Sequence, residues 1–515
     1  MGNSLQIFRC IGDRMRNLNV NIPPPIVTYY GNGNKKTEKW LLDGMMHSYN
    51  DLPAYIYYNE SGTVKCKSWC KNNRFHRDND LPAVIEYYED GKEKENYWWY
   101  NHRLYRNNNM PVIVTYYENG NIKDKKWYQN GSCHRDNDLP ASITYYIEGP
   151  KSGEYWCQNG KLHRDNDLPA SIDYHQSGYI KRKQWYQNGR RIRSDKNSPV
   201  SIEYDLNGQK HTELWCDNGY HHRDGDLPAH IQYHNNGQPQ HKIWYKNNVV
   251  HRDNNQPANI SYYDNGIAET KIWKKNGKLH RDNDLPAWEE YYENGKEIGK
   301  KWFKDGLCHR ENDLPAILAY YPSGQKRTEI WFYCDKTHRD GNMPAYIEYY
   351  ENGMESQKRW YQNGFLCREN NLPPFISYYE SGKEHIIKRY KNNYLHSDND
   401  LPAWIEYYEN GKEQYENWYQ NDERHRDNDL PARILYYENG QEMEKVWYKN
   451  GKLHRDNNLP AIIEYYENGQ EKGKEWYRYG KFHRDNDLPV WIEYYKNGQE
   501  MEKRWYLDGK LQRRD

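Results

Sequence analysis

Net charge, phenylalanine and long apolar runs are scarce in this chain, and their scarcity removes several classes of protein. Lysine plus arginine equal aspartate plus glutamate at 74 each, so no overall field draws the chain to nucleic acid or an anionic membrane. No apolar run is long enough to span a bilayer. The first ten residues, MGNSLQIFRC, lack the apolar centre of a secretory signal. We therefore expect a protein that neither crosses a membrane nor is secreted.

The chain instead has a period of 29 residues. Prolines recur at this spacing from Pro24 to Pro489 and divide the chain into 17 repeats, with one extra residue between Trp185 and Pro199. A fixed period of this size indicates a repeat array rather than closed globular domains. We expect an N-terminal cap or tail at residues 1–22, the array at 23–511, and a C-terminal tail at 512–515.

Each repeat has the pattern of two strands joined by a tight turn. After Pro460, the apolar residues Ala461, Ile463 and Tyr465 alternate with other positions, which predicts a strand with one buried face. All 17 repeats have tyrosine five residues after the proline and glycine nine residues after it. That glycine follows asparagine in many repeats, as in a hairpin turn. The second strand is charged and ends at a tryptophan, which only Arg389 replaces.

A second turn is predicted four residues after each tryptophan. Glycine occupies that position in 11 repeats, and the other residues there are Asn, Asp or His, which tolerate a positive φ better than most. We therefore expect left-handed backbone at this position. The non-glycine residues are Asn73, His102, Asn248, Asp335, Asn393 and Asp422.

These patterns favour an all-β fold, an elongated array of antiparallel β-hairpins. Burial of two aromatic rings and an isoleucine stabilises one repeat by roughly 10–15 kcal/mol. The conformational entropy lost when its residues become ordered costs on the order of 40 kcal/mol. A single repeat should therefore not fold without its neighbours. The alternative is a parallel β-solenoid with one coil per repeat, which would be about half as long because strands stack about 4.8 Å apart.

The run EYYENGQEKGKEWYRYGKFHRD at residues 464–485 resembles the variant MORN repeat, in which a YY-x-NG turn is followed by a W-Y-x-NG turn. The resemblance covers residues 23–511, although the 29-residue spacing and the HRDNDLPA connector depart from the common consensus. It implies an elongated hairpin array that acts as a scaffold or a membrane-associated adaptor, and a bacterial subset resembles antitoxins. Long arrays with this connector resemble those encoded by large DNA viruses of amoebae.

The connector motif His-Arg-Asp-Asn imitates the start of a protein-kinase catalytic loop. The chain lacks the Gly-rich loop, strand lysine and Asp-Phe-Gly motif that a kinase also needs, so we expect no catalytic residue. Equivalent histidines of a hairpin array lie about 10 Å apart, too far to share a zinc ion, and should be half-buried rings bonded to connector backbone. We expect no metal and no cofactor.

The other connector residues favour turn and register roles. Asp and Asn alternate two residues before the proline, which suits an Asx turn better than a calcium site. Arg77, Asp78 and their equivalents are expected to form an ion-pair ladder. The nine cysteines are odd in number and scattered, and six of them replace tyrosine, leucine or histidine singly, as Cys70 does, which indicates neither disulfides nor zinc and favours a reducing cytosol. With a viral origin, the compartment would be the host cytoplasm or the virion.

A protein partner is expected along the position two residues after each proline, where large residues point away from the Ala-Ile-Tyr face. Packing on a neighbouring strand or in a dimer is the alternative. The candidate partner-binding residues are Trp288, Tyr346, Phe375, Trp404 and Trp491.

The leading interpretation is a non-enzymatic scaffold that binds another protein along an extended face. The second is a membrane-surface adaptor acylated at Gly2, although Gln6 departs from the myristoylation motif. The third is an antitoxin-like inhibitor of a partner protein. Nucleic acid is not expected because the aromatic residues face inward, and no small-molecule substrate is expected.

Overall fold

The computed structural model describes residues 22–507 and 510–515. This part of the chain contains 65 β-strands and one short 3-10 helix, Glu369–Asn371, and no α-helix. The chain divides into two compact bodies, Met1–Pro239 with Tyr245–Asn248, and Gln240–Trp244 with Val249–Asp515. The same strand pattern recurs in both bodies, so the predicted all-β fold is confirmed.

Each repeat begins with a long hairpin that continues into the next repeat. In the N-terminal body, β17 (Ser142–Tyr145) pairs antiparallel with β18 (Lys151–Tyr155), and β18 pairs antiparallel with β21 (Ser171–Tyr174) of the following repeat. The long strands of this kind number 35 in the described part of the chain. Because these pairings are antiparallel, the parallel solenoid is wrong and the hairpin array is confirmed.

The C-terminal body repeats this arrangement with the same register. There β59 (Ile462–Tyr465) pairs with β60 (Glu471–Glu475), and β60 pairs with β63 (Trp491–Tyr494). Opposite Ile462 on one side lies Glu475, and Glu475 in turn lies opposite Trp491. The side chains two residues after consecutive prolines therefore belong to one continuous row that crosses the strands.

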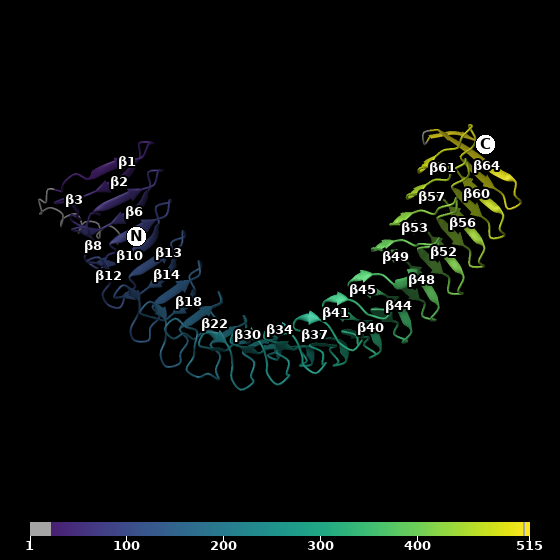
Figure 1. Cartoon of the computed structure of the whole chain (residues 1–515). Helices are drawn as coiled ribbons and strands as arrows, with labels where there is room; N and C mark the ends of the chain where they lie inside the picture. Colours follow the sequence, from purple (N-terminus) through teal and green to yellow (C-terminus); the bar gives the residue numbers. More distant parts are fainter. Residues whose placement is uncertain (1–21, 508–509) are drawn as a thin grey trace, which may run out of the picture. The chain divides into compact units, whose positions relative to one another are not determined.

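A second, shorter hairpin follows the tryptophan of each repeat. In the repeat that begins at Pro460 it consists of β61 (Tyr477–Arg478) and β62 (Lys481–Phe482). The described residues contain 15 such two-stranded sheets, and the repeat with the extra residue has only the bridge between Gln187 and Arg190 instead. In the C-terminal body the short strands form a second row beside the long ones, as β53, β57 and β61 do beside β52, β56 and β60 (Figure 1).

Both predicted turns have the backbone that their residues favour. In the long hairpin, Gly469 has φ of 83° and donates its N–H to the carbonyl of Tyr466 at 2.8 Å, which closes a three-residue loop with a bulge. In the short hairpin, Asn450 and Gly451 have φ of 49° and 73°, the two positive values of a type I′ turn. The left-handed conformation predicted at the second turn is confirmed.

The core is a series of small clusters, one per repeat, around the tryptophan. Trp418 and Ile434 are 6% and 8% exposed, Ala432 is fully buried between them, and Tyr436 and Tyr448 pack against the cluster. The backbone N–H of Trp418 donates to the Ala432 carbonyl at 2.8 Å, so the tryptophan of one repeat is bonded to the residue just before the first strand of the next. The core therefore joins repeats rather than filling any one of them, as expected for a linear array.

The last repeat ends differently from the others. Its second long strand, β64 (Glu500–Leu507), pairs antiparallel with a final strand, β65 (Lys510–Arg514), where other repeats have a short hairpin. Residues 512–515, expected as a tail, therefore include the end of a strand. The expected N-terminal segment 1–22 lies almost wholly outside the described residues.

Candidate interaction surfaces

In most repeats the connector arginine bonds its repeat to the preceding one. The Arg455 guanidinium carbon lies 3.8 Å from the centroid of the Trp447 ring, and its Nη1 donates to the Pro460 carbonyl at 3.3 Å. The same guanidinium donates to both oxygens of Asp429, two residues before the preceding proline. Stacking on a ring and a bidentate carboxylate contact are both geometries that a planar guanidinium suits. Equivalent arginine–carboxylate contacts join Arg77 to Asp51, Arg106 to Asp80, Arg164 to Asp138, Arg193 to Asp167, Arg310 to Asp284, Arg339 to Asp313 and Arg426 to Asp400.

These contacts correct the expected connector roles. An ion-pair ladder is present, but Arg77 pairs with Asp51 of the preceding repeat and not with its neighbour Asp78. The residue two before the proline does not serve mainly as an Asx turn. Asp80, for example, has φ of 56° and accepts from Arg106. Asn and Asp alternate there because both tolerate left-handed backbone, and Asn109 still accepts from an arginine at 2.9 Å.

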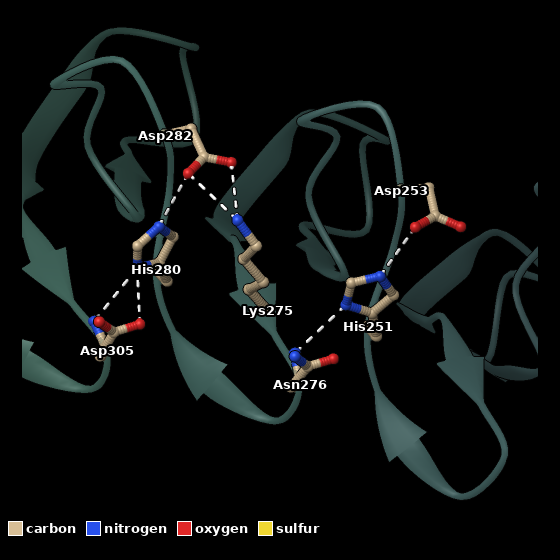
Figure 2. A network of polar contacts seen from close by, with 7 residues as sticks. All are labelled: His251, Asp253, Lys275, Asn276, His280, Asp282 and Asp305. Atoms are coloured by element: carbon tan, nitrogen blue, oxygen red, sulfur yellow. Dashed lines mark hydrogen bonds and ion pairs between the residues drawn. The ribbon is translucent and has the colours of Figure 1, made fainter.

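The connector histidine links its own aspartate to the next repeat (Figure 2). His280 Nε2 lies 3.0 Å from Asp282 Oδ1, and the backbone N–H of Asp305 donates to His280 Nδ1 at 3.1 Å. The Asp305 carboxylate also lies 3.2 Å from His280 Nδ1, so the ring contacts an acid at each nitrogen. The predicted half-buried ring is present, but its partners are a carboxylate and a turn N–H of the next repeat rather than backbone of its own connector.

The acid in this network has a lowered pKa. Hydrogen bonds from His280 and then from Lys275 hold the pKa of the Asp282 carboxyl below its usual range. The Lys275 ammonium lies 3.3 Å from this carboxylate (Figure 2). Because both ring nitrogens are engaged by protein groups, the connector histidines of this kind have a structural role. The described residues contain no group of three or more His, Cys, Asp or Glu placed to hold a metal ion.

The five candidate partner-binding residues lie where the sequence placed them on the strands, but they are half-buried rather than exposed. Each opens the first strand of its repeat, and each lies opposite a polar or charged residue of the neighbouring strand on the same row. Trp288 has Lys301 over its ring at 4.9 Å, and Trp491 has Arg504 at 3.9 Å. The expectation of an exposed aromatic row is therefore wrong for these residues.

Three of these residues form an alternating row of rings and cations. Arg359 lies between Tyr346 and Phe375, at 5.0 and 5.4 Å from their ring centroids. Lys388 follows, at 5.8 Å from Phe375 and 3.9 Å from Trp404. Desolvation lowers the pKa of this lysine, as expected for an ammonium covered by aromatic rings. Cross-strand contacts of this type stabilise a sheet and leave the rings little free surface.

Short hairpins cover this row, and the sequence pattern did not reveal them as a separate layer. Ile317, which occupies the same phase as Trp288, packs against the buried cluster that contains Cys308, and Phe303 and Phe332 of two consecutive short hairpins pack against the same cluster. The row therefore lies between the long strands and the short ones. Two-residue strands carry no recognisable period, so only the assembled array shows that they cover a face.

A periodic row of exposed apolar side chains lies one residue before most of the prolines. Of the 16 connectors that precede Pro53 to Pro489, 14 have Leu or Met at this position, and all 14 side chains are 37–47% exposed. This phase does not build the core, yet it is almost always apolar. We call these residues the connector-edge row: Leu52, Leu81, Met110, Leu139, Leu168, Leu227, Leu285, Leu314, Met343, Leu372, Leu401, Leu430, Leu459 and Leu488.

Acidic side chains flank the connector-edge row. Three residues before Leu81, Asp78 is 76% exposed, and Asp340 has a 96% exposed side chain beside Met343. The neighbouring arginines are already engaged with carboxylates and with tryptophan rings, as Arg339 is with Asp313 and Trp331. At Asp78 and Asp340 the edge is therefore both apolar and acidic, whereas a cation pairs with the equivalent acid at Asp282, Glu311 and Asp398.

One groove along this edge in the C-terminal body is larger than its equivalents. A cavity of about 850 Å³ lies between two successive connectors and is lined by Leu307, Tyr333, Cys334 and Met343 among others. The preceding repeat has an equivalent hollow of about 230 Å³ around Asn283. Tyr333 and Leu307 are 58% and 44% exposed, so apolar surface is concentrated here.

The repeat without a tryptophan has a compensating change. Arg389 stands at the tryptophan position, and Ser397 stands where most other connectors have arginine, Ser48 being another exception. Ile387, at a position that is Lys or Glu in most repeats, is 7% exposed and packs with Trp360, Ile376 and Ile405. This repeat therefore keeps its apolar core while its cation comes from the strand instead of the connector.

Glu289 is the one polar residue at the isoleucine position, and it also has local partners. Arg281 Nη1 donates to Glu289 Oε1 at 2.9 Å, and Tyr291 donates its hydroxyl to Oε2 at 2.5 Å. The residue two before the preceding proline is Asn255, which lacks a charge. Glu289 thus supplies the carboxylate for Arg281 from the sheet, which gives this acid a structural role.

Comparison with known proteins gives no family. No protein-family model and no curated protein sequence matches the chain. Similar solved structures include TcdB2-TccC3-TEV, at 10% identity and a TM-score of 0.13 over 98% of this chain, and TcdB2-TccC3, at 11% identity and a TM-score of 0.11 over 94%. This chain spans 32% and 31% of those two chains. At these TM-scores the likeness carries no argument about function.

The remaining predicted site concerns the membrane. Gly2, the proposed acylation site, lies outside the described residues. Among the residues that are described, no helix has the length and apolar character needed to cross a membrane.

Proposed function

We propose that this protein is a non-enzymatic scaffold that binds a partner protein along the connector-edge row. The observation that carries the proposal is the periodic exposure of Leu and Met one residue before the proline. An apolar side chain that is repeated at one phase and stays about 40% exposed contributes little to folding. A partner that covers several of these side chains at once would gain from every repeat it spans.

The chemistry of the edge defines the partner. The apolar row is flanked by exposed aspartates such as Asp78 and Asp340, so the complementary surface presents apolar and basic side chains. The groove of about 850 Å³ beside Tyr333 and Met343 would receive an anchoring side chain. We place the partner on this edge rather than on Trp288 and its equivalents, because those rings are half-buried under the short hairpins.

The remaining parts of the proposal rest on the sequence. The resemblance to variant MORN repeats supports a scaffold, because arrays of that kind are implied to act as scaffolds or adaptors. The polar residues of the repeated connector are engaged in contacts between repeats, as Arg455 and His280 are, which favours a role without catalysis. We propose a cytosolic location on the basis of the single, scattered cysteines.

A triple variant of the edge tests the proposal. Leu285→Ser, Leu314→Ser and Met343→Ser remove three consecutive members of the row around the groove. The matched control is Phe365→Ser with Tyr394→Ser, two residues that are 59% and 52% exposed at short-hairpin tips. Wild type and both variants would be used to capture proteins from the native host, with quantitative mass spectrometry as the readout.

We expect one captured protein whose amount falls at least about tenfold with the edge variant and stays unchanged with the control variant. The reason is that each anchoring side chain removed should cost more than about 1 kcal/mol of binding free energy. Purified partner should then bind wild type directly, and the binding should weaken with salt because basic residues meet an acidic edge. Equal capture by the edge variant, at unchanged thermal stability, would overturn the proposed surface.

A further inference from the structure

Consecutive short hairpins touch through one recurring pair of side chains. The residue that ends one short hairpin contacts the residue that begins the next one. The ring centroids of Phe75 and Trp99 are 5.7 Å apart in the N-terminal body. In the C-terminal body Phe482 ends a short hairpin and lies 4.9 Å from Tyr506, which has the same phase but belongs to the long strand β64 of the last repeat. His221 and Tyr245 make the same contact at 5.2 Å. The array thus places two side chains face to face at each such junction.

At one junction both of these positions are cysteine. Cys133 ends β16 (Ser132–Cys133), and Cys157 begins β19 (Cys157–Gln158) in the next repeat. The backbone N–H of Gly160 donates to the Cys133 carbonyl at 3.0 Å, which fixes the two hairpins side by side. The two thiols are close enough for each to shift the pKa of the other, and the Cys133 thiol also donates to the Ala141 carbonyl at 3.9 Å. Both residues are half-buried, so a small reagent can reach them.

Other thiols in the described part of the chain lack this arrangement. Cys308 ends a short hairpin, but Phe332 packs against its cluster from the next repeat. Cys216 begins a short hairpin in the same phase as Cys157 and is equally half-buried, but Arg191 is the charged group near it. Cys70 is only 1% exposed. The chain therefore offers matched single thiols beside the paired ones.

The two thiols of the pair have different pKa values because each one affects the other. The neighbouring Cys157 thiol lowers the pKa of the Cys133 thiol, and the neighbouring Cys133 sulfur raises the pKa of the Cys157 thiol. Lys126 also lowers the Cys133 value to a lesser extent. The first thiolate of the pair is therefore that of Cys133, and a thiolate is the form that reacts with oxidants.

We propose that Cys133 and Cys157 are a redox modification site at which peroxide forms a disulfide between two consecutive repeats. The Cys133 thiolate attacks one peroxide oxygen, the O–O bond breaks, and the hydroxide released takes up a proton to become water, leaving a sulfenic acid on Cys133. The Cys157 sulfur then attacks this sulfenic sulfur, loses its proton, and releases a second water. Overall, two thiols lose two hydrogen atoms and one peroxide becomes two waters.

Peptide mapping of the intact full-length protein tests this site. The reduced protein would be treated with hydrogen peroxide, its remaining thiols alkylated, and its peptides sequenced by mass spectrometry before and after reduction with a thiol reductant. A linked peptide containing Cys133 and Cys157 should appear, and reduction should remove it. It should form roughly tenfold faster than any linkage involving Cys216, because proximity favours the second step.

Variants and a local readout complete the test. Cys133→Ser and Cys157→Ser should each abolish the linked peptide, whereas Cys216→Ser should leave it unchanged. Oxidation should slow amide exchange in β16 and β19 while leaving β61 and β62 unaffected. The proposal is overturned if wild-type protein leaves both thiols open to alkylation while Cys216 oxidises, a result that needs no variant to fold.

Discussion

Arg389 donates its Nη1 to the carbonyl oxygen of Pro402 at 2.7 Å. In the next repeat the same kind of proline carbonyl is bonded by the connector arginine, Arg426, at 3.3 Å, and that arginine stacks on Trp418. One repeat therefore reaches the proline carbonyl with a guanidinium from the strand, and its neighbour does so with one from the connector. In this repeat Arg389 stands at the tryptophan position and supplies the guanidinium that the connector lacks at Ser397.

A double-mutant cycle on these two positions should show strong coupling. Arg389→Trp alone gives a ring without a guanidinium, and Ser397→Arg alone adds a second cation next to Arg389. Together they restore the stacked pair, so the double variant should be more stable than the sum of the single effects by about 1–2 kcal/mol. Any strain between the tryptophan introduced by Arg389→Trp and Ile387 is present in both the single and the double variant, so it does not enter the coupling energy. Additive effects in urea unfolding would contradict the coupling.

The connector arginine should matter more than other surface arginines. Arg455→Ala removes the stacking on Trp447 and the contact with Asp429, and should destabilise that junction by about 1–3 kcal/mol. Arg455→Lys should recover only part of the lost stability, because an ammonium cannot both stack on the Trp447 ring and make the bidentate contact with Asp429. The control is Arg478→Ala, whose half-exposed pair with Asp485 should contribute less than about 1 kcal/mol. Hydrogen exchange near each site measures the effect locally, and equal effects would refute the assignment.

Three glycines should respond differently to alanine. Gly451 has φ of 73°, so Gly451→Ala should cost about 1–2 kcal/mol, whereas Gly451→Asn should be tolerated because asparagine occupies this phase at Asn73. At Gly299 an added Cβ would lie 2.7 Å from the Leu318 carbonyl oxygen, so Gly299→Ala should shift the strand. Gly473→Ala is the control, because its Cβ would meet only ordinary contacts at 3.7 Å or more. Thermal unfolding should rank Gly473→Ala as the mildest of the three alanine variants.

Acid should loosen the junctions between repeats. Hydrogen bonds from arginines lower the pKa values of Asp138, Asp313 and Asp400 below their usual range. A carboxyl whose pKa is lower in the folded state stabilises the fold above its unfolded pKa, near 4, and this stability is lost as the pH falls through the folded pKa. Unfolding free energy should therefore fall below about pH 4. Asp138→Asn should fold, as Asn109 shows, and should weaken this pH dependence; an unchanged dependence would argue against the pair.

Part of the array could be read from short stretches of sequence. Alternation around Ile463, the Asn-Gly pair before β60 and the left-handed position at Gly451 depend on residues close in the chain, so their conformations were predictable. The redundancy of the repeats strengthened each prediction, because an accidental pattern at one place would not recur at every proline.

Other features depended on where neighbouring repeats lie. The partner of Arg77 is Asp51 and not Asp78, since the connector backbone turns the adjacent carboxylate toward His76. The large side chains at Trp288 and Phe375 looked exposed because strand alternation says only which face a residue is on, not what covers that face. The short hairpins lie over that face, and their two-residue strands are too short to show a period in the sequence.

The sequence by itself determined the hairpins, their turns and the tryptophan core, because backbone preference and alternation act within a few residues. Only the tertiary structure decided which surface is free and which thiols meet. The connector-edge row is exposed and Cys133 faces Cys157 because consecutive repeats are bonded side by side, a spatial relation between residues that are separate along the chain.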